Sequence, residues 1–366
     1  MGLKVGIVGL PNAGKSTIFN ALTKSGIAAD NYPFCTIDPN VGIVHVPDNR
    51  LLDLENLFKP KSTVNTIIEF VDIAGLVKGA SKGEGLGNQF LSHIRDVDAI
   101  INVARLFKDD NVSHVEGSIN PQRDLEIIEM ELLLKDIMSI EKHLEKMKKL
   151  CKSGDQNAQS VSQVLQKMLP KMNEGILANN ILINQEDKEQ IKHLSLLTNK
   201  PILYLANIDE SEIINEKNSS NYELIKQHAK KNNSTAIKIC GNLEYEISLL
   251  EKEEKQQYFQ EFNLLESGLD KLIKSAYELL KLQTFFTAGE KEVRAWTIKQ
   301  GMSAQEAAGV IHSDMERGFI KAEIYSVYDI KKYGSEINLK EAGKIRQEGK
   351  DYEVEDGDVI YFKFNV

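Results

Sequence analysis

Gly9-Leu-Pro-Asn-Ala-Gly14-Lys15-Ser16 is the stretch of sequence that decides the fold. It fits the pattern G-x-x-x-x-G-K-[ST], whose glycines let backbone N–H groups turn toward a phosphate. The apolar segment from Leu3 to Val8 comes before it and is typical of a buried strand. The segment from Thr17 to Lys24 follows, with apolar residues at helical spacing and Gly26 as a stop signal. A strand, a glycine loop and a helix N-terminus together predict a P-loop site for a nucleoside triphosphate.

The polar groups of this loop have separate expected roles. Lys15 should reach the β- and γ-phosphates and stabilise the charge that develops during hydrolysis, and the Ser16 hydroxyl should bind Mg²⁺. The residues expected to contact the nucleotide here are Asn12, Ala13, Gly14, Lys15, Ser16 and Thr17.

The chain as a whole has the composition of a globular protein. Its 366 residues, 42% hydrophobic and 27% charged, predict two or three domains. No apolar run approaches the roughly eighteen residues of a membrane helix, and no secretory signal is expected. The three cysteines are far apart without metal-ligand spacing, so we expect reduced thiols in the cytoplasm.

A net charge of −9 argues against broad binding to nucleic acid but not against a local basic surface. Between Lys142 and Lys152 there are five lysines against one acid, Glu145. This run is either such a surface or simply the solvated face of a helix.

A second part of the phosphate site follows the strand-like segment from Thr66 to Val71. There Asp72-Ile-Ala-Gly75 fits the pattern D-x-x-G. Asp72 should hold Mg²⁺ through its water shell, because Mg²⁺ keeps several waters and takes few carboxylates. The Gly75 N–H should contact the γ-phosphate.

The proline-bracketed segment from Asn31 to Pro39 is expected to be a loop that orders around the γ-phosphate. Thr36 is its candidate second hydroxyl ligand of Mg²⁺, unless it is an ordinary loop threonine. The neighbouring Cys35 is either a redox sensor or an inert thiol.

Leu76 stands where Ras-type GTPases carry the glutamine that orients the attacking water. A leucine cannot hydrogen-bond to water, so intrinsic hydrolysis should be slow or rely on another group. His114, in a polar loop, is the candidate to position or deprotonate that water. An exposed histidine without a role is the alternative.

The segment Asn207-Ile-Asp-Glu210 should contact the base, because it follows the buried strand Pro201 to Ala206. Guanine-specific enzymes have N-K-x-D here, and the aspartate accepts hydrogen bonds from guanine. Ile208 and Glu210 replace the lysine and the aspartate, so the preference for guanine over adenine should be weak or reversed. Asp209 lies one position before the usual aspartate, and its carboxylate could still contact guanine if the register of this segment shifts by one residue. Cys240 and Gly241 are expected in the last loop against the base.

Two further regions complete the expected organisation. In the first region, apolar residues recur at alternating spacings of four and three, and the same pattern repeats after a break at Ser153–Asn157. This predicts two antiparallel helices joined by a short loop. The apolar residues are Leu133, Ile137, Ile140, Leu144, Met147 and Cys151, then Val161, Leu165, Met168 and Met172. From about Gln283 the strand-like segments and the capping box of Ser303 with Glu306 predict a small mixed β domain crossed by a single helix.

These motifs together resemble the YchF or Obg-like ATPase family, a branch of the Obg-type P-loop GTPases. The most specific resemblance is the run from Phe285 to Trp296, with Glu348-Gly-Lys-Asp-Tyr352 and Asp356-Gly-Asp358, which looks like the family's TGS domain. The implied fold is α/β: a Ras-like P-loop domain, an inserted antiparallel coiled-coil arm and a C-terminal β-grasp (TGS) domain. The expected bounds are 1–123 with 199–282, then 124–198, then 283–366.

The resemblance also implies function. It implies Mg²⁺-dependent hydrolysis of ATP in preference to GTP, association with the large ribosomal subunit or the whole ribosome, contact with ribosomal RNA or tRNA, and a link to redox or stress responses. A monomer without membrane contact is expected. In this family an aliphatic residue replaces the catalytic glutamine, and that residue maps to Leu76. The family's proposed loop histidine maps to His114. Asn12 lies where some relatives coordinate K⁺.

Three hypotheses follow for the activity. The first is a slow ATPase that regulates translation and is accelerated by a ribosomal partner. The second is a nucleotide-gated module that binds ribosomes or RNA with incidental turnover, which Leu76 favours. The third is a conventional GTPase, which Ile208 and Glu210 disfavour.

Overall fold

The computed structural model divides the chain into two compact units. Unit 1 comprises Met1–Val44 and Glu69–Leu272, and unit 2 comprises His45–Ile68 and Ile273–Val366. The structure describes residues 3–26, 40–73, 86–109, 118–214, 219–261 and 264–365.

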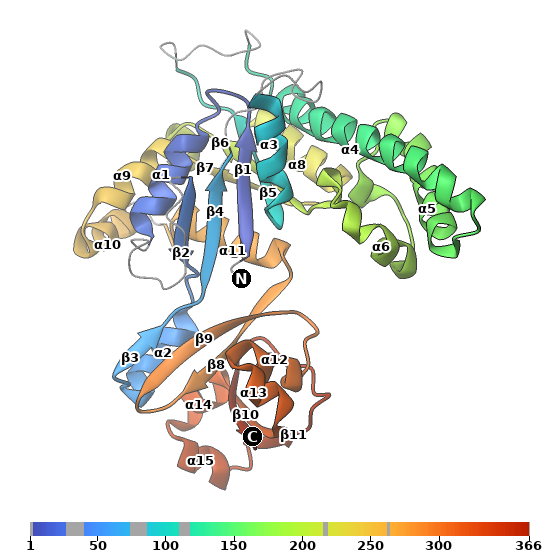
Figure 1. Ribbon diagram of the computed structural model, residues 1–366. Helices are drawn as coiled ribbons and strands as arrows, with labels where there is room; N and C mark the ends of the chain where they lie inside the picture. The colour runs from blue at the N-terminus through green and yellow to red at the C-terminus, as the bar shows by residue number, and fades with distance from the viewer. Residues whose placement is uncertain are drawn as a thin grey trace. The chain divides into compact units, whose positions relative to one another are not determined.

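A six-stranded sheet in the order β2-β4-β1-β5-β6-β7 forms the centre of unit 1 (Figure 1). Parallel pairing joins β1 to β4 and β5, β5 to β6, and β6 to β7. Every residue of β5 and β6 is buried, as expected of parallel strands covered on both faces. The strands are β1 (Lys4–Gly9), β2 (Val41–His45), β4 (Ile67–Asp72), β5 (Ala99–Arg105), β6 (Ile202–Asn207) and β7 (Ala236–Ile239).

Helices cover both faces of this sheet. Figure 1 shows α1 and α9 on one side and α3, α4 and α8 on the other. The helices are α1 (Lys15–Ser25), α3 (Leu86–Arg95), α4 (Pro121–Lys152), α8 (Ser220–Lys231) and α9 (Gly241–Leu249), with α7 (Ser211–Ile214), α10 (Lys252–Glu261) and α11 (Gly268–Leu279). The strands and the first helix predicted around the glycine loop are therefore confirmed, and so is the α/β class.

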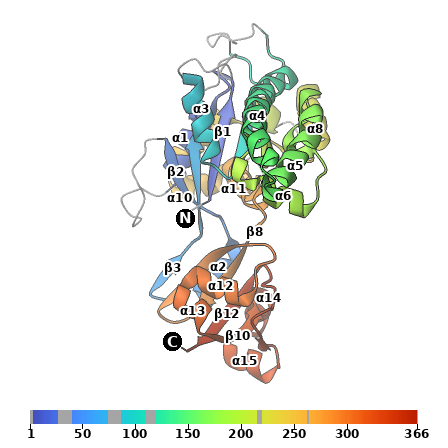
Figure 2. The ribbon, with the colours of Figure 1, turned by 45° about the vertical axis from the view of Figure 1, so that its right-hand side comes forward.

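The predicted helix pair is also confirmed, as α4 and α5 (Gln156–Asn173). The chain reverses between them, where the Asp155 side chain accepts a hydrogen bond from the Ala158 N–H and caps α5. Figures 1 and 2 both show the two helices side by side. Their contact buries Ile140, Leu165 and Met168 in a core that continues into the sheet, so this arm is part of unit 1.

The arm continues beyond α5 through short helices. They are η3 (Ala178–Asn180), α6 (Gln185–Ile191), η4 (Lys192–Leu194) and η5 (Leu197–Asn199). Asp136 of α4 is buried and accepts hydrogen bonds from the N–H groups of Leu197 and Thr198, which attaches the end of this segment to α4.

Unit 2 contains a second sheet, ordered β11-β10-β12-β8-β9-β3. β8 and β9 form an antiparallel pair, β12 runs parallel to β8, and α12 (Ala304–Ile311) follows β9, which is a β-grasp arrangement. The capping box of Ser303 and Glu306 begins α12 as predicted. The strands are β3 (Ser62–Val64), β8 (Leu282–Ala288), β9 (Glu292–Lys299), β10 (Phe319–Ser326), β11 (Arg346–Glu348) and β12 (Asp358–Phe364).

The expectation of a single helix across this sheet is wrong. One face packs against the alanines of α12, and the other buries side chains of α2, α14 and α15. The additional helices are α2 (Asn49–Phe58), α13 (Ser313–Arg317), α14 (Val327–Tyr333) and α15 (Glu336–Glu341). Several are too short to show a helical period in the sequence.

The expected domain bounds also need correction, because residues 45–68 belong to unit 2 rather than to the nucleotide-binding domain. In this segment β3 pairs in parallel with β9, and Leu51 and Leu54 of α2 are buried against the sheet of unit 2. The chain thus leaves the first sheet after β2 and returns to it at β4.

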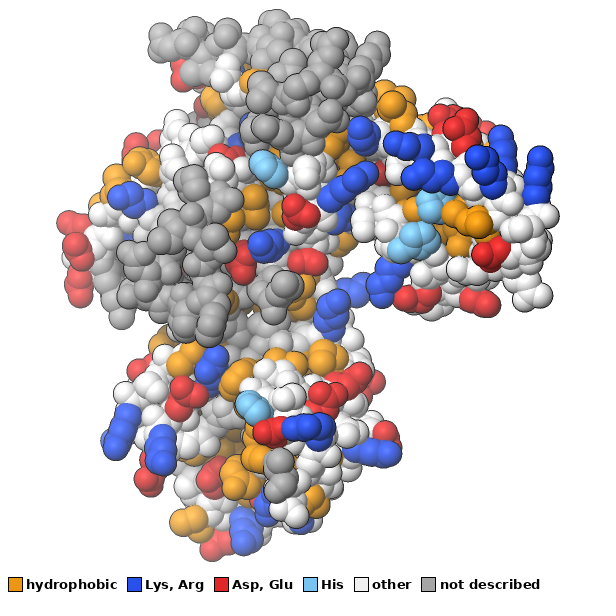
Figure 3. Space-filling view, viewed as in Figure 1, with side chains coloured by type: hydrophobic (Ala, Val, Ile, Leu, Met, Phe, Trp, Pro, Cys, Tyr) orange, Lys and Arg blue, Asp and Glu red, His pale blue; other side chains and the backbone are white. Residues whose placement is uncertain are grey.

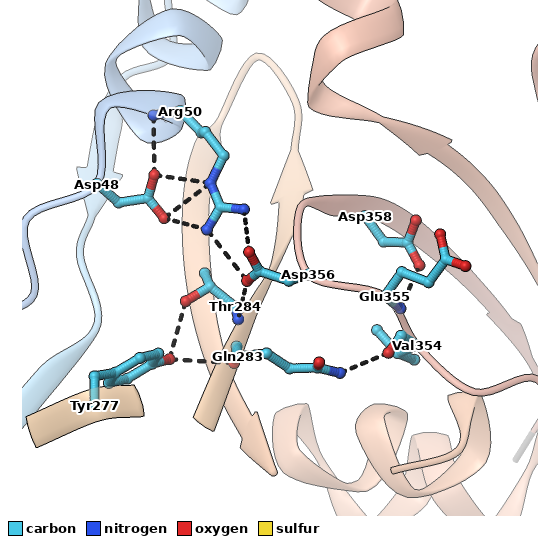
Figure 4. Close-up of polar contacts among 9 residues, drawn as sticks. All are labelled: Asp48, Arg50, Tyr277, Gln283, Thr284, Val354, Glu355, Asp356 and Asp358. Atoms are coloured by element: carbon cyan, nitrogen blue, oxygen red, sulfur yellow. Dashed lines mark hydrogen bonds and ion pairs between the residues drawn. The ribbon is translucent and has the colours of Figure 1, made fainter. Parts of the chain in front are cut away.

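Arg50 fastens this segment to the rest of unit 2 (Figure 4). Its guanidinium binds Asp48 and reaches Asp356, with Nη2–Oδ2 and Nη1–Oδ2 distances of 2.7 and 2.6 Å. It also lies 5.3 Å from the ring centre of Phe286. Asp356 in turn accepts a hydrogen bond from the Thr284 N–H at 2.8 Å. The two carboxylates raise the pKa of Arg50 despite its partial burial.

None of the helices in the described part of the chain combines the length and apolarity needed to cross a bilayer.

We expect Arg50→Met to lower the free energy of unfolding by about 2 kcal/mol, because two carboxylates lose a charged hydrogen-bond partner. The matched control is Lys331→Met, which breaks an exposed ion pair with Asp53 of α2 and should cost less than about 1 kcal/mol. Denaturant titration of the full chain measures both. Equal effects of the two substitutions would contradict the anchoring role of Arg50.

Candidate nucleotide-binding site

The glycine loop connects β1 to α1 and leaves the start of that helix open. Asn12 and Gly14 have φ angles of 65° and 85°, in the left-handed region. Gly14 is the N-cap of α1 and supplies no side-chain cap, so the N–H groups of the first turn keep their capacity for an anion. A Cβ at Gly14 would lie 2.1 Å from the Asn207 Nδ2, so only glycine fits there.

Lys15 lies folded into this loop. Its side chain is buried, and its Nζ donates a hydrogen bond to the Leu10 carbonyl at 3.3 Å. Burial lowers the pKa of Lys15, and the charge of Asp72 partly opposes that shift. A phosphate at the helix N-terminus would give this ammonium group a strong partner.

Ser16 and Asp72 lie together beside the loop, as expected of Mg²⁺ ligands. The Ser16 hydroxyl donates to the Asp72 Oδ2 at 3.2 Å, while the Asp72 Oδ1 is buried without a hydrogen-bond partner. A water molecule in the shell of Mg²⁺ would satisfy that oxygen, and a hydroxyl with a carboxylate is a suitable donor set. The residues present therefore fit the ion.

Asn207 at the end of β6 joins three loops. Its Nδ2 donates to the Ala13 carbonyl and its Oδ1 accepts from the Gly241 N–H, both at 3.0 Å. Its own carbonyl accepts from the N–H groups of Leu106 and Phe107 at 2.8 and 3.1 Å. One buried residue thus holds the phosphate loop against the segments that follow β5 and β7.

A cavity of about 290 Å³ lies next to Gly14 at this edge of the sheet. The predicted site residues Gly14, Thr17, Asn207, Ile208, Glu210 and Cys240 all line it. Gly241 takes part through the hydrogen bond from its N–H to Asn207. The cavity lies at the carboxyl ends of the parallel strands, where such sheets bind ligands.

The segment Asn207–Glu210, predicted to contact the base, presents its two acids unequally. Ile208 is buried, and its N–H donates to the Ile239 carbonyl at 2.9 Å. The Asp209 Oδ2 accepts a hydrogen bond from the Lys108 N–H at 3.3 Å, so this carboxylate contacts the segment after β5. Glu210 is exposed at the cavity.

Cys240 forms part of the cavity wall as a neutral group. Burial raises the pKa of its thiol, and the nearby charges of Glu210 and Asp209 raise it further.

The cavity includes residues that the sequence analysis did not single out. Phe107, Lys108 and Asp109 follow β5, and Asn242, Leu243 and Glu246 lie on α9. The available signal was that Phe107–Asp109 come shortly after the mostly apolar segment Ala99–Ala104, at the kind of strand end where parallel sheets bind ligands. Five other predicted residues, Thr36, Cys35, Gly75, Leu76 and His114, lie outside the described residues.

Two family models match the chain. A model described as a 50S ribosome-binding GTPase matches residues 4–167. A model named for the C-terminal domain of YchF GTPases, and described as a protein of unknown function, matches residues 282–365.

Full-length relatives are similar to this chain. The "Ribosome-binding ATPase YchF" of Bacillus subtilis is 53% identical, and that of Escherichia coli O157:H7 is 50% identical, each over 100% of both chains. The solved structure of the Schizosaccharomyces pombe YchF GTPase is 40% identical with a TM-score of 0.89, covering 99% of this chain and 98% of that one.

We expect Asn207→Ala to lower the free energy of unfolding by about 2 kcal/mol, because it leaves the Ala13 carbonyl and the Gly241 N–H unpaired. It should also weaken binding of an ATP analogue, since the glycine loop loses its support. Asn102→Ala on β5 is the matched control. That buried amide makes only a 3.5 Å contact with the Leu125 carbonyl, so its removal should cost less. Equal losses of nucleotide affinity in thermal-shift titrations would contradict the role of Asn207.

Proposed function

Because this chain belongs to the YchF family, we propose that it is a ribosome-associated, Mg²⁺-dependent ATPase that hydrolyses ATP to ADP and phosphate in preference to GTP. The observation that carries the proposal is the base cavity, where Asn207-Ile-Asp-Glu210 takes the place of a guanine-reading segment. The names of the relatives differ on this point, since the bacterial proteins are called ATPases and the yeast protein a GTPase.

The preference for adenine follows from the chemistry of the two bases. Guanine presents N1–H and a 2-amino group to a carboxylate, whereas adenine presents an acceptor at N1 and a donor at N6. Ile208 is buried and carries no charge, and Asp209 is bonded to the segment after β5. A charged hydrogen bond is worth roughly 1.5–3 kcal/mol, so its loss lowers guanine affinity by about one to two decades.

The phosphate side supports hydrolysis through groups already in place. Lys15 and the N–H groups at the start of α1 would stabilise charge on the β- and γ-phosphates. Ser16 and Asp72 would hold Mg²⁺, which when bound neutralises phosphate charge.

The remaining ligand and catalytic assignments complete the proposal. Thr36 is the second hydroxyl ligand of Mg²⁺, Gly75 contacts the γ-phosphate, and His114 positions the attacking water because Leu76 cannot. K⁺ at Asn12 is a further candidate cofactor. We assign the protein to the cytoplasm as a monomer with a redox or stress link, and Cys35 remains either a redox sensor or an inert thiol.

The helical arm offers the surface for the ribosome. Figure 3 shows Lys and Arg side chains gathered over the arm, where α4 runs in Figure 1. Lys142, Lys146 and Lys149 are exposed there, and the ring centres of His143 and His193 lie 5.5 Å apart. On a chain of net charge −9, a local basic surface is what RNA phosphates require.

A nucleotide-gated binding module is the second candidate function. In that case ATP and ADP set the affinity for ribosomes or RNA, and turnover is incidental. Leu76 in place of a water-orienting glutamine favours this alternative.

We expect His114→Ala to lower ribosome-stimulated turnover at saturating ATP by about 100-fold, with unchanged ATP affinity, because a general base contributes on that scale. His312→Asn, at the N-cap of α13, is the control and should leave turnover unchanged. Unchanged turnover in the His114 variant would remove its chemical role and favour the binding module.

We expect charge reversal of Lys146, Lys148 and Lys149 to glutamate to abolish co-sedimentation with ribosomes at physiological salt, because the arm would then repel phosphates. Basal hydrolysis of ATP should not change.

The control for this experiment reverses the same number of charges at Lys226, Lys230 and Lys231 of α8, which are also exposed. Loss of co-sedimentation in both variants would indicate a net-charge effect, and retention in the arm variant would exclude the arm as the contact surface.

A further inference from the structure

Arg105 is a buried arginine beside the base cavity, at the last position of β5. Only 3% of its surface is exposed. It does not line the cavity itself, yet the three residues Phe107–Asp109 that follow shortly after it do.

The guanidinium group of Arg105 holds this following segment. Its Nε donates to the Phe107 carbonyl at 3.3 Å, and its Nη2 donates to the Asp109 carbonyl at 3.2 Å. The guanidinium carbon lies 4.4 Å from the ring centre of Phe107, within cation–π distance. One side chain therefore contacts both ends of the Phe107–Asp109 wall and the ring of its first residue.

The same wall is held from its other side by the base-reading strand. The Leu106 and Phe107 N–H groups donate to the Asn207 carbonyl, and the Lys108 N–H donates to Asp209. Acceptors at the end of β6 and just after it satisfy three donors of the segment, and Arg105 satisfies two of its acceptors. The position of the wall relative to the base depends on both sets.

Stability alone does not explain this arginine. Among the described residues no ion pair links Arg105 to a carboxylate, and its Nη1 is buried without a hydrogen-bond partner. Burying a charge with an unsatisfied donor costs free energy, which offsets part of what its two hydrogen bonds to carbonyls contribute to stability. Only a guanidinium group supplies this geometry, because the compact ammonium group of a lysine cannot bond to both carbonyls and stack on the Phe107 ring at once.

We propose that Arg105 is a positioning residue for base selection, which holds the Phe107–Asp109 wall at the distance that suits adenine. This inference rests on the proposed preference for ATP. It assigns the selectivity to the wall after β5 together with the segment Asn207–Glu210, rather than to that segment alone.

The test is calorimetric titration of the full chain with non-hydrolysable ATP and GTP analogues, for the wild type, Arg105→Lys and Arg105→Met. Arg105→Lys keeps the charge and most of the volume, so it remains informative if the methionine variant does not fold. We expect both variants to lower the ATP-to-GTP affinity ratio about tenfold, while kcat at saturating ATP changes by less than about twofold.

A general loss of stability would weaken both analogues equally and leave the ratio unchanged. The matched control is Arg123→Met, which also removes a guanidinium bound to a loop carbonyl, that of Ser118, away from the cavity. An unchanged ratio in Arg105→Lys, or an equal fall in Arg123→Met, would overturn the inference. A wild type without preference for ATP would instead contradict the proposed function.

Discussion

The hydrogen bonds of the Asn207 side-chain amide are the interactions on which the rest of the predicted nucleotide site depends. The amide joins the Ala13 carbonyl of the glycine loop to the Gly241 N–H at the start of α9, while the Asn207 backbone carbonyl holds the segment after β5. These loops come from distant parts of the sequence. The glycine loop and the segments that line the cavity therefore share one buried support.

The sharing of that support has a consequence for selectivity. The segments that line the cavity after β5, β6 and β7 are hydrogen-bonded to one another, so we expect a change in one of them to affect the others. Asp209 illustrates the point, because its carboxylate bonds to Lys108 of the neighbouring segment. An acid adjacent to the usual guanine-reading position is thereby engaged in holding the wall. The absence of a guanine signature is the feature on which the proposed preference for adenine rests.

Local patterns predicted much of this molecule, and long-range contacts account for what they missed. The glycine loop, its flanking strand and helix, and the α4–α5 pair follow from periodicity and turn chemistry within short windows. The assignment of residues 45–68 to unit 2 does not, because β3 has three residues and the Arg50–Asp356 pair spans 306 positions. Phe107–Asp109 were missed for the same reason, since only the adjacency of β5 and β6 brings them to the base cavity.

The central claim is that this P-loop site selects adenine. The most direct test is calorimetric titration of the purified, nucleotide-free protein with ATP and GTP analogues in the presence of Mg²⁺. We expect ATP to bind at least about tenfold more tightly than GTP, on the scale of one lost charged hydrogen bond to guanine. Tighter binding of GTP would contradict it and would mean that Asp209 or Glu210 still reads guanine.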